Sequence, residues 1–214
     1  GHYDPEITYE CPGFYTVGEQ VFKCWIFDKG GHGLMDLKNG FAQSCNGYFI
    51  QMGIGLGAGR MLQTARDFGL GSETGLNAQK LPEYEGMLPK PEELEGDGNI
   101  ANLAMGQGKI LVTPLQAAGM AAIIANGGIR NTFNIIDCIV NHEGEIIRDM
   151  KTREWQRVIS RETAKAMMEM MEATVESGTG QKADIGGYFG AAGKTGSAET
   201  GLFEGDRRIL HAWF

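Results

Sequence analysis

The spacing of apolar residues predicts helices in the first half of the chain. Residues 1–31 are aromatic and rich in glycine without helical spacing, which indicates irregular or extended structure. Apolar residues recur at helical spacing in the runs 34–41, 48–57 and 61–68. Residues 71–99 combine prolines, glycines and acidic residues and predict a long loop. A loop of this length in a compact domain is usually functional.

Capping signals define two further helices. Thr113 as the N-cap, a proline directly after it and Gly127 beyond the end delimit a helix over 113–126. Ser160 caps a second helix, which Gly178 ends. The methionines of this second helix are interpreted as core filler.

Strand signals are concentrated in the last third. The runs 133–140 and 145–147 flank a polar tetrapeptide and predict a hairpin. Segments 193–198 and 208–214 predict two more strands. Because the helices mostly precede the strands instead of alternating with them, the predicted fold class is α+β.

The 214 residues suit one large domain or two small ones. We interpret 1–214 as part of one domain, with a helical part at about 32–128 and a hairpin, helix and sheet part at about 129–214. A net charge of −8 argues against a nucleic-acid partner. No apolar run approaches the ~18 residues of a membrane span, and the first ten residues do not resemble a signal peptide.

The four cysteines, Cys11, Cys24, Cys45 and Cys138, form no C-x-x-C pair and no cluster with histidine at the spacing of a zinc site. We therefore expect no metal site and no cofactor. Cys11 and Cys24 are close enough in sequence for a small disulfide loop in an oxidising compartment, and two ordinary thiols are an equal alternative.

Two short segments carry candidate chemistry. Lys194-Thr195-Gly196-Ser197 combines a lysine and two hydroxyls with a glycine that lets a substrate backbone approach, as an anion-binding strand edge would. In Ser44-Cys45-Asn46, a hydroxyl and a carboxamide two positions apart could face one cleft. Each has a structural alternative, an exposed lysine on an edge strand for the first and helix caps for the second.

In this order, and with their surroundings, the two segments resemble the S-D-N and K-T-G motifs that accompany S-x-x-K in penicillin-binding proteins. The wider context is similar to the high-molecular-weight class B penicillin-binding proteins. The resemblance covers nearly the whole chain. It is carried by His32-Gly33, by Ser44-Cys45-Asn46 with Tyr48-Phe49, by Phe68-Gly69-Leu70-Gly71 with Thr74-Gly75, by Gly106-Gln107-Gly108, by Thr113-Pro114-Leu115-Gln116, by Ala125-Asn126-Gly127-Gly128, by the segment 192–199 and by Ala212-Trp213-Phe214.

The resemblance implies a peptidoglycan D,D-transpeptidase on the membrane's extracytoplasmic face. Its serine acyl-enzyme would be formed from a D-Ala-D-Ala stem peptide or from a β-lactam, and other cell-wall synthesis proteins would be partners. Ser44 would relay a proton to the leaving amine, and Asn46 would bind the donor's acyl amide. Lys194 would tune the proton network. Thr195 and Ser197 would hold the substrate carboxylate, Gly196 would let the substrate backbone approach, and the Ser197 backbone N–H would supply half of the oxyanion hole.

One departure affects the activity: no serine of the chain has a lysine three residues later, so the nucleophile is not in this chain. Thr179-Gly180-Gln181-Lys182 has only the spacing. We expect this chain alone to be inactive, and to dimerise through exposed sheet edges.

Three other functions fit part of the sequence pattern. A serine β-lactamase and a non-catalytic penicillin sensor or scaffold share the fold and remain alternatives. A nucleotide-binding module is suggested by the G-x-G-x-x-A run at 53–58 with Glu73 further on. The chain then enters a loop instead of a second strand, so helix packing explains these glycines better.

Overall fold

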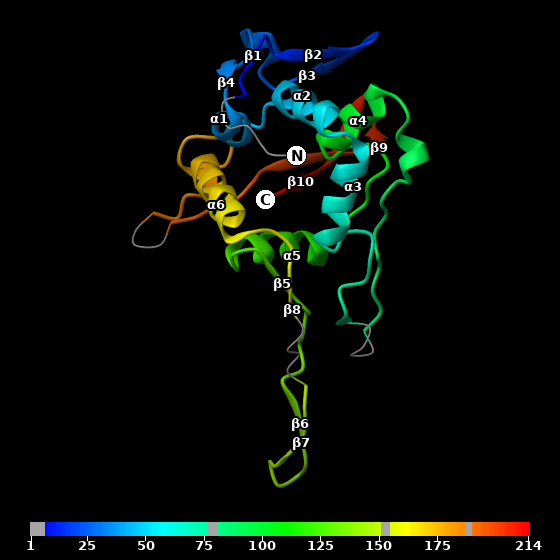
Figure 1. Ribbon diagram of the computed structural model, residues 1–214, viewed down its shortest axis with the longest axis vertical. Helices are drawn as coiled ribbons and strands as arrows, with labels where there is room; N and C mark the ends of the chain where they lie inside the picture. The colour runs from blue at the N-terminus through cyan, green and yellow to red at the C-terminus, as the bar shows by residue number, and fades with distance from the viewer. Residues whose placement is uncertain (1–6, 77–80, 151–154, 187–189) are drawn as a thin grey trace. The chain divides into compact units, whose positions relative to one another are not determined.

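The computed structural model describes the whole chain apart from residues 1–6, 77–80, 151–154 and 187–189. The described residues form six α-helices and ten short strands, which pair into five separate two-stranded antiparallel sheets (Figure 1). This mixture of helices and small antiparallel sheets confirms the predicted α+β class. No helix of the described part is both long and apolar enough to cross a membrane.

The chain divides into two compact units. The first contains residues 1–62, 89–110 and 166–214, and the second contains 63–88 and 111–165. Sequence analysis divided the chain in sequence order at about residue 128, whereas each compact unit combines segments that are distant in the sequence.

The first unit begins with short strands. Strand β1 (Tyr9–Cys11) pairs with β4 (Gly33–Met35), and β2 (Phe14–Val17) pairs with β3 (Gln20–Lys23). A short 3₁₀ helix, η1 (Phe27–Lys29), lies between β3 and β4. The helical spacing over 34–41 was therefore misread at its start, because Leu34 pairs with Glu10 in a sheet.

Helices follow these strands. Asp36 caps α1 (Leu37–Ala42) by accepting a 2.7 Å hydrogen bond from the Asn39 amide. Helices α2 (Asn46–Leu56) and α3 (Ala58–Asp67) confirm the next two predicted helices. The predicted loop over 71–99 instead ends in the 3₁₀ helix η3 (Pro91–Leu94) and the start of α4 (Asp97–Ala104).

Helix α4 packs closely on α2. A Cβ atom added at Gly53 of α2 would lie 2.5 Å from the Cβ of Ala104. The absence of a side chain at Gly53 therefore allows the contact, which supports helix packing as the explanation of this glycine. Sequence analysis missed α4 because its eight residues are few and include a glycine.

The last elements of the first unit are α6 (Arg161–Glu176), the 3₁₀ helix η4 (Gln181–Ala183), and the strands β9 (Gly196–Glu204) and β10 (Arg207–Trp213). The first five residues of α6 belong to the second unit. Strands β9 and β10 form an antiparallel pair in which Ser197 lies opposite Ala212. This pair confirms the two strands predicted at the end of the chain.

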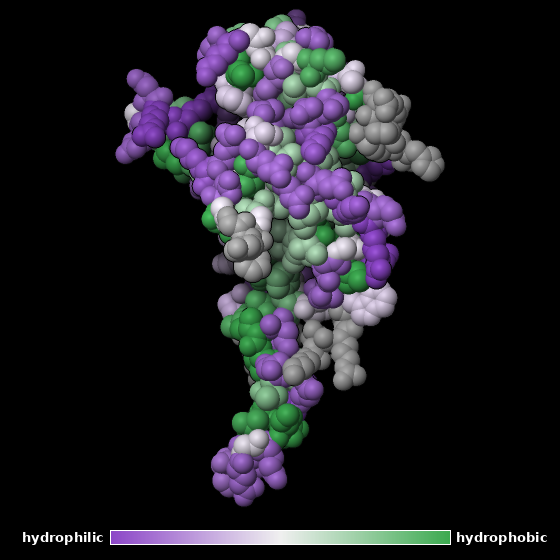
Figure 2. Space-filling view, turned by 90° about the vertical axis from the view of Figure 1, so that its left-hand side faces the viewer, coloured by the Kyte–Doolittle hydropathy of each residue, from purple (hydrophilic) through white to green (hydrophobic). Residues whose placement is uncertain are grey.

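The second unit is built on α5 (Pro114–Ala125), β5 (Ile129–Asn131), β6 (Cys138–Val140), β7 (Ile146–Asp149) and β8 (Trp155–Arg157). Thr113 caps α5 as predicted, and its side chain accepts from the Gln116 amide. The β6–β7 pair confirms the predicted hairpin, while the β5–β8 pair was not predicted. The hairpin carries exposed apolar side chains, visible as green atoms above its polar tip in Figure 2: Ile139, Val140, Ile146 and Ile147.

Candidate active site

Lys194 and Ser44 meet in the first unit. The Lys194 Nζ donates a 2.9 Å hydrogen bond to the Ser44 Oγ and a 2.8 Å hydrogen bond to its neighbour's carbonyl, Thr195 O. It also lies 5.7 Å from the centroid of the Phe41 ring. The two segments that sequence analysis selected for their chemistry are therefore in direct contact.

Ser44 lies in the short connection between α1 and α2. Its φ of 55° is positive, and it is the sole residue other than glycine with a positive φ in the described ranges. Such a conformation is costly for a residue with a Cβ and is typical of functional sites. The turn directs the Ser44 hydroxyl toward Lys194.

Lys194 precedes strand β9 and is fixed by its neighbours. The amide of Gly193 donates to the carbonyl of Met171 on α6. A Cβ at Gly193 would lie 2.3 Å from the ring of Phe214, so only glycine fits here without rearrangement of that ring. The backbone next to the lysine is thus held between a helix and the end of the chain.

Burial changes the acidity of Lys194. Its pKa is lowered, and desolvation of the ammonium is the sole cause. Among the described residues, no carboxylate offsets this loss of hydration. A lysine with a lowered pKa next to a hydroxyl can take up and release a proton more readily than an exposed lysine.

A second hydroxyl pair ties the lysine segment to the end of α1. The side-chain hydroxyls of Thr195 and Thr179 form a short hydrogen bond. The Thr179 amide donates a 3.0 Å hydrogen bond to the carbonyl of Ala42. The segment 179–182, with its bare T-x-x-K spacing, therefore contributes Thr179 as a support of Thr195.

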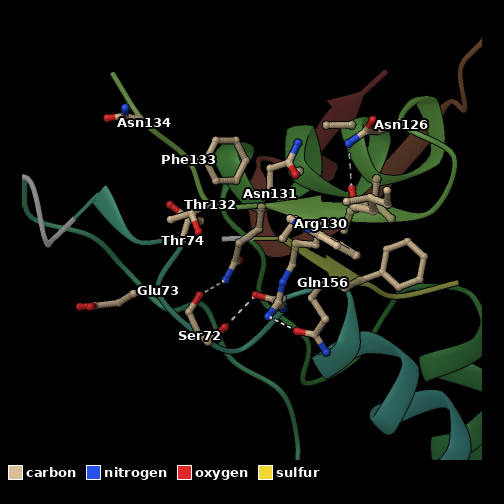
Figure 3. Close-up of a pocket in the computed structure, with 18 residues that line it drawn as sticks. Ser72, Glu73, Thr74, Asn126, Arg130, Asn131, Thr132, Phe133, Asn134 and Gln156 are labelled. Atoms are coloured by element: carbon tan, nitrogen blue, oxygen red, sulfur yellow. Dashed lines mark hydrogen bonds between the residues drawn. The ribbon is translucent and has the colours of Figure 1, made fainter. Parts of the chain in front are cut away.

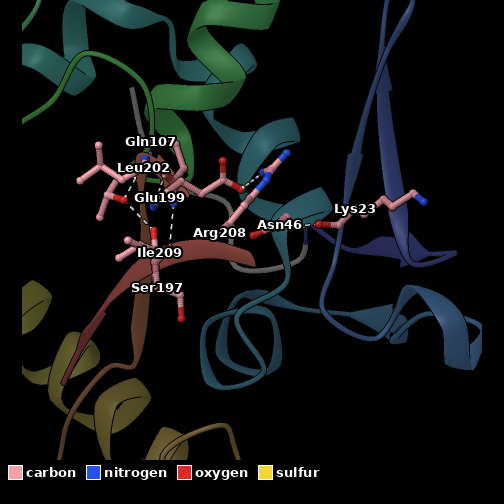
Figure 4. Close-up of polar contacts among 9 residues, drawn as sticks. Lys23, Asn46, Gln107, Ser197, Glu199, Leu202, Arg208 and Ile209 are labelled. Atoms are coloured by element: carbon pink, nitrogen blue, oxygen red, sulfur yellow. Dashed lines mark hydrogen bonds and ion pairs between the residues drawn. The ribbon is translucent and has the colours of Figure 1, made fainter. Parts of the chain in front are cut away.

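Strand β9 is positioned by Gln107, as Figure 4 shows. The Gln107 Nε2 donates a 2.9 Å hydrogen bond to the Ser197 carbonyl, and its Oε1 accepts a 3.4 Å hydrogen bond from the Glu199 amide. One side chain thus binds the β9 backbone as a neighbouring strand would. Gly196 and Ser197 remain exposed at the start of this strand.

Asn46 is the first residue of α2. Its Nδ2 donates a 2.8 Å hydrogen bond to the carbonyl of Lys23 (Figure 4). The structure therefore joins Ser44, Lys194 and Thr195 through hydrogen bonds, while the Asn46 amide is directed to the end of β3.

The structure also brings together four residues that the sequence did not group. Cys11, Cys24, His32 and Cys45 place one ligand atom each within 4.8 Å of one another. All four cysteines of the chain are free thiols, including the Cys11–Cys24 pair. Cys11 and Cys24 are 13 positions apart, and Cys24 and Cys45 are 21 positions apart. Neither separation matches the C-x-x-C spacing by which zinc sites are recognised in a sequence.

A cavity of about 640 Å³ lies in the second unit, at α5, β5 and β8 (Figure 3). None of the predicted site residues lines it. Gln116 in its wall donates to the carbonyls of Ser72 and Glu85, and Arg130 donates to the Asp67 carbonyl. These polar groups hold the unit together, and we assign no chemistry to the cavity.

Comparison with known proteins gives consistent matches. The sequence profile of the family described as penicillin binding protein transpeptidase domain matches residues 1–214. Stage V sporulation protein D of Bacillus subtilis is 34% identical over 191 residues, which cover 87% of this chain and 28% of that protein.

Two solved structures extend this match. Penicillin binding protein 3 from Mycobacterium tuberculosis, complexed with aztreonam, is 30% identical with a TM-score of 0.79, covering 96% of this chain and 46% of that one. The D,D-transpeptidase domain of a peptidoglycan glycosyltransferase from Eggerthella lenta is 25% identical with a TM-score of 0.82, covering 92% and 49%. The chain thus spans less than a third of its curated relative and less than half of these solved chains.

Proposed function

Because the chain belongs to the penicillin-binding protein transpeptidase domain family, we propose that it is part of a serine-type peptidoglycan D,D-transpeptidase. The observation that carries this proposal is the hydrogen bond from Lys194 to Ser44, which unites the second and third motifs of the family signature. Cell-wall cross-linking is the corresponding activity of the complete protein.

In the proposed reaction, a serine of an S-x-x-K motif attacks the carbonyl between the two terminal D-alanines of a stem peptide. The terminal D-alanine leaves with a proton, and the acyl group of the resulting seryl ester passes to an amine of a second stem, whose proton returns to the released serine. Such covalent catalysis divides one difficult step into two easier ones. The 214 residues contain no S-x-x-K, so the nucleophile is not among them.

The residues of this chain would act on protons and on substrate position. Ser44 passes a proton to the leaving amine, and Lys194 supplies and recovers that proton across their 2.9 Å hydrogen bond. The hydroxyls of Thr195 and Ser197 bind the substrate carboxylate. The exposed start of β9, with Gly196, lets the substrate backbone lie along the strand.

Asn46 would bind the acyl amide of the donor peptide through its side-chain oxygen. Its Nδ2 is already held by the Lys23 carbonyl, which leaves the oxygen as the group for the substrate amide. The Ser197 amide would contribute to the oxyanion hole. Removal of one such donor typically slows catalysis by ~10²–10³-fold.

The substrate class is a stem peptide that ends in D-Ala-D-Ala, and β-lactams are inhibitors because they mimic that end. We place the complete protein at the extracytoplasmic face of the cytoplasmic membrane, among other cell-wall synthesis proteins. A homodimer through sheet edges remains a prediction, motivated by the two-stranded β9–β10 sheet in the described residues. Light scattering tests it, and a clean monomer would contradict it.

The function is tested by acylation. The chain alone, incubated with excess benzylpenicillin, should keep its intact mass, and a longer protein that includes an S-x-x-K segment should gain one penicilloyl group. Rapid loss of that group would indicate a β-lactamase. A stable adduct without any cross-linking of stem peptides would indicate a sensor.

A further inference from the structure

Four side chains, three of them buried and His32 half-buried, converge from four separate segments of the first unit. Cys11 ends β1, Cys24 follows β3, His32 precedes β4, and Cys45 is the residue directly before α2. The three cysteines are at most 3% exposed. These segments are the short strands at the top of Figure 1 and the helix next to them.

Three of the distances within this cluster are close to those of a tetrahedral metal site, and all four ligand atoms lie within 4.8 Å of one another. The Cys11 and Cys24 sulfurs are 3.7 Å apart, and the Cys24 and Cys45 sulfurs are 4.0 Å apart. The Nδ1 of His32 is 3.4 Å from the Cys11 sulfur. Zn–S bonds of about 2.3 Å in a tetrahedron separate two sulfurs by about 3.8 Å, and a Zn–N bond of about 2.0–2.1 Å gives about 3.6 Å from nitrogen to sulfur.

Each sulfur also accepts a backbone N–H, as thiolate ligands do. Gly13 donates to the Cys11 sulfur at 3.4 Å. The amides of Gly47 and Tyr48 donate to Cys24 and Cys45 respectively. Such hydrogen bonds around the ligands are typical of metal sites, where they stabilise the charge on sulfur.

His32 supports the same conclusion. Its Nε2 is buried and has no hydrogen-bond partner within the described residues, and its Nδ1 meets only the weakly polar Cys11 sulfur. A ring nitrogen that meets only a thiol is weakly paired. A metal bond at Nδ1 would replace that weak contact with a strong one.

We propose that Cys11, Cys24, His32 and Cys45 form a structural Zn²⁺ site. Three thiolates and one imidazole are soft ligands that select zinc over magnesium or calcium. Four protein ligands leave no open position, so the site is structural and not catalytic.

The site would hold the second motif in place. Cys45 lies between Ser44 and Asn46, so a bond from its sulfur to the metal fixes the backbone of both. Strands of three or four residues in two-stranded sheets are only marginally stable alone. Metal binding in such a region contributes directly to folding. The consequence for acylation rests on the proposed function, whereas the metal site itself does not.

Metal content tests the site directly. The chain, produced with zinc supplied and purified without chelator, should contain about one zinc per chain by elemental mass spectrometry. Cys24→Ser should lose the metal. Cys138→Ser is the matched control, because Cys138 is a free thiol in β6 of the second unit, and it should retain the metal.

Cobalt substitution covers the case in which Cys24→Ser does not fold. The wild-type chain with Co²⁺ should show thiolate charge-transfer absorption and the visible bands of a tetrahedral site. In His32→Cys, a fourth thiolate should increase the charge-transfer absorption by about a third. Unchanged absorption in this variant would exclude His32 as a ligand.

Two results would overturn the proposal. The first is that the wild-type chain, although produced with zinc supplied, contains no metal, while Cys11, Cys24 and Cys45 all react as free thiols once the chain is unfolded. The second is a metal-free chain whose intact mass is lower by two hydrogens and whose peptide map shows a disulfide between two of the three cluster cysteines. Neither result depends on penicillin, so failure of the metal site and failure of the proposed function are distinguishable.

Discussion

The Lys194 Nζ lies 2.9 Å from the Ser44 Oγ, although the two residues are 150 positions apart in the sequence. Ser44 reaches this contact from a turn with a positive φ, and Lys194 reaches it from the residue pair before β9. The contact joins a hydroxyl to a lysine whose pKa is lowered by burial. Proton transfer between the two motifs is the activity that this geometry favours.

Lys194→Met in the complete protein should slow acylation by benzylpenicillin by roughly 10²–10⁴-fold, because a positioned acid–base group is removed. Stopped-flow or gel-based measurement with a fluorescent penicillin gives the rate. Lys109→Met is the control, since the exposed Lys109–Glu93 ion pair of the same unit should contribute little. Equal rates for wild type and Lys194→Met would contradict the assignment.

The stability of the chain should rise with pH between the lowered pKa of Lys194 and 10.5, the ordinary value for lysine. In this range the unfolded chain binds the lysine proton more tightly than the folded chain, so unfolding becomes less favourable as pH increases. Urea unfolding over a pH series measures the effect. Subtracting the free energy of unfolding of Lys194→Met from that of wild type removes the contribution of other titrating groups. This difference should increase with pH, and a difference that decreases or stays constant would refute the prediction.

The two active-site segments, 44–46 and 194–197, were predictable because each is short and combines residue types with recognisable chemistry. Helix α5 was predictable because Thr113 and the proline after it give a local signal. By contrast, β4 begins at Gly33 only because β1 lies beside it, and Leu34 also fits a helical spacing. Local patterns cannot report such a partner.

Gly53→Ala should destabilise the chain by about 1–3 kcal/mol, because its Cβ would overlap the Ala104 Cβ at the contact of α2 and α4. Gly55→Ala in the same helix has open space at its Cβ and should stabilise the chain by about 0.5–1 kcal/mol. Chemical denaturation measures both variants. Opposite signs are the expected result, and similar values would argue against close packing at Gly53.

Gln107→Ala should loosen the start of β9, since its side chain binds the Ser197 carbonyl and the Glu199 amide. Loss of these hydrogen bonds should cost about 1 kcal/mol locally. Hydrogen exchange at the Glu199 amide should become faster. Gln63→Ala is a control, because Gln63 forms an exposed hydrogen bond within α3, to Asp67. Unchanged exchange at Glu199 in Gln107→Ala would show that β9 does not need this support.

The cysteine cluster lay beyond sequence reasoning for a different reason. Cys11, Cys24 and Cys45 are separated by loops and strands, and no short motif marks them. The antiparallel pairs β1–β4 and β2–β3, together with the packing of α2 on these strands, bring the segments together. A histidine close to a turn between cysteines was the one available signal, and it is too common to be specific.

Peptide mapping of the complete protein after reaction with benzylpenicillin tests the central claim most directly. The account predicts one penicilloyl group on a serine that has a lysine three residues later and lies outside the 214 residues, with the group lost in a variant lacking that serine. An adduct on Ser44 would make Ser44 the nucleophile and overturn the proton-transfer role given to it. No adduct at all would contradict the transpeptidase function.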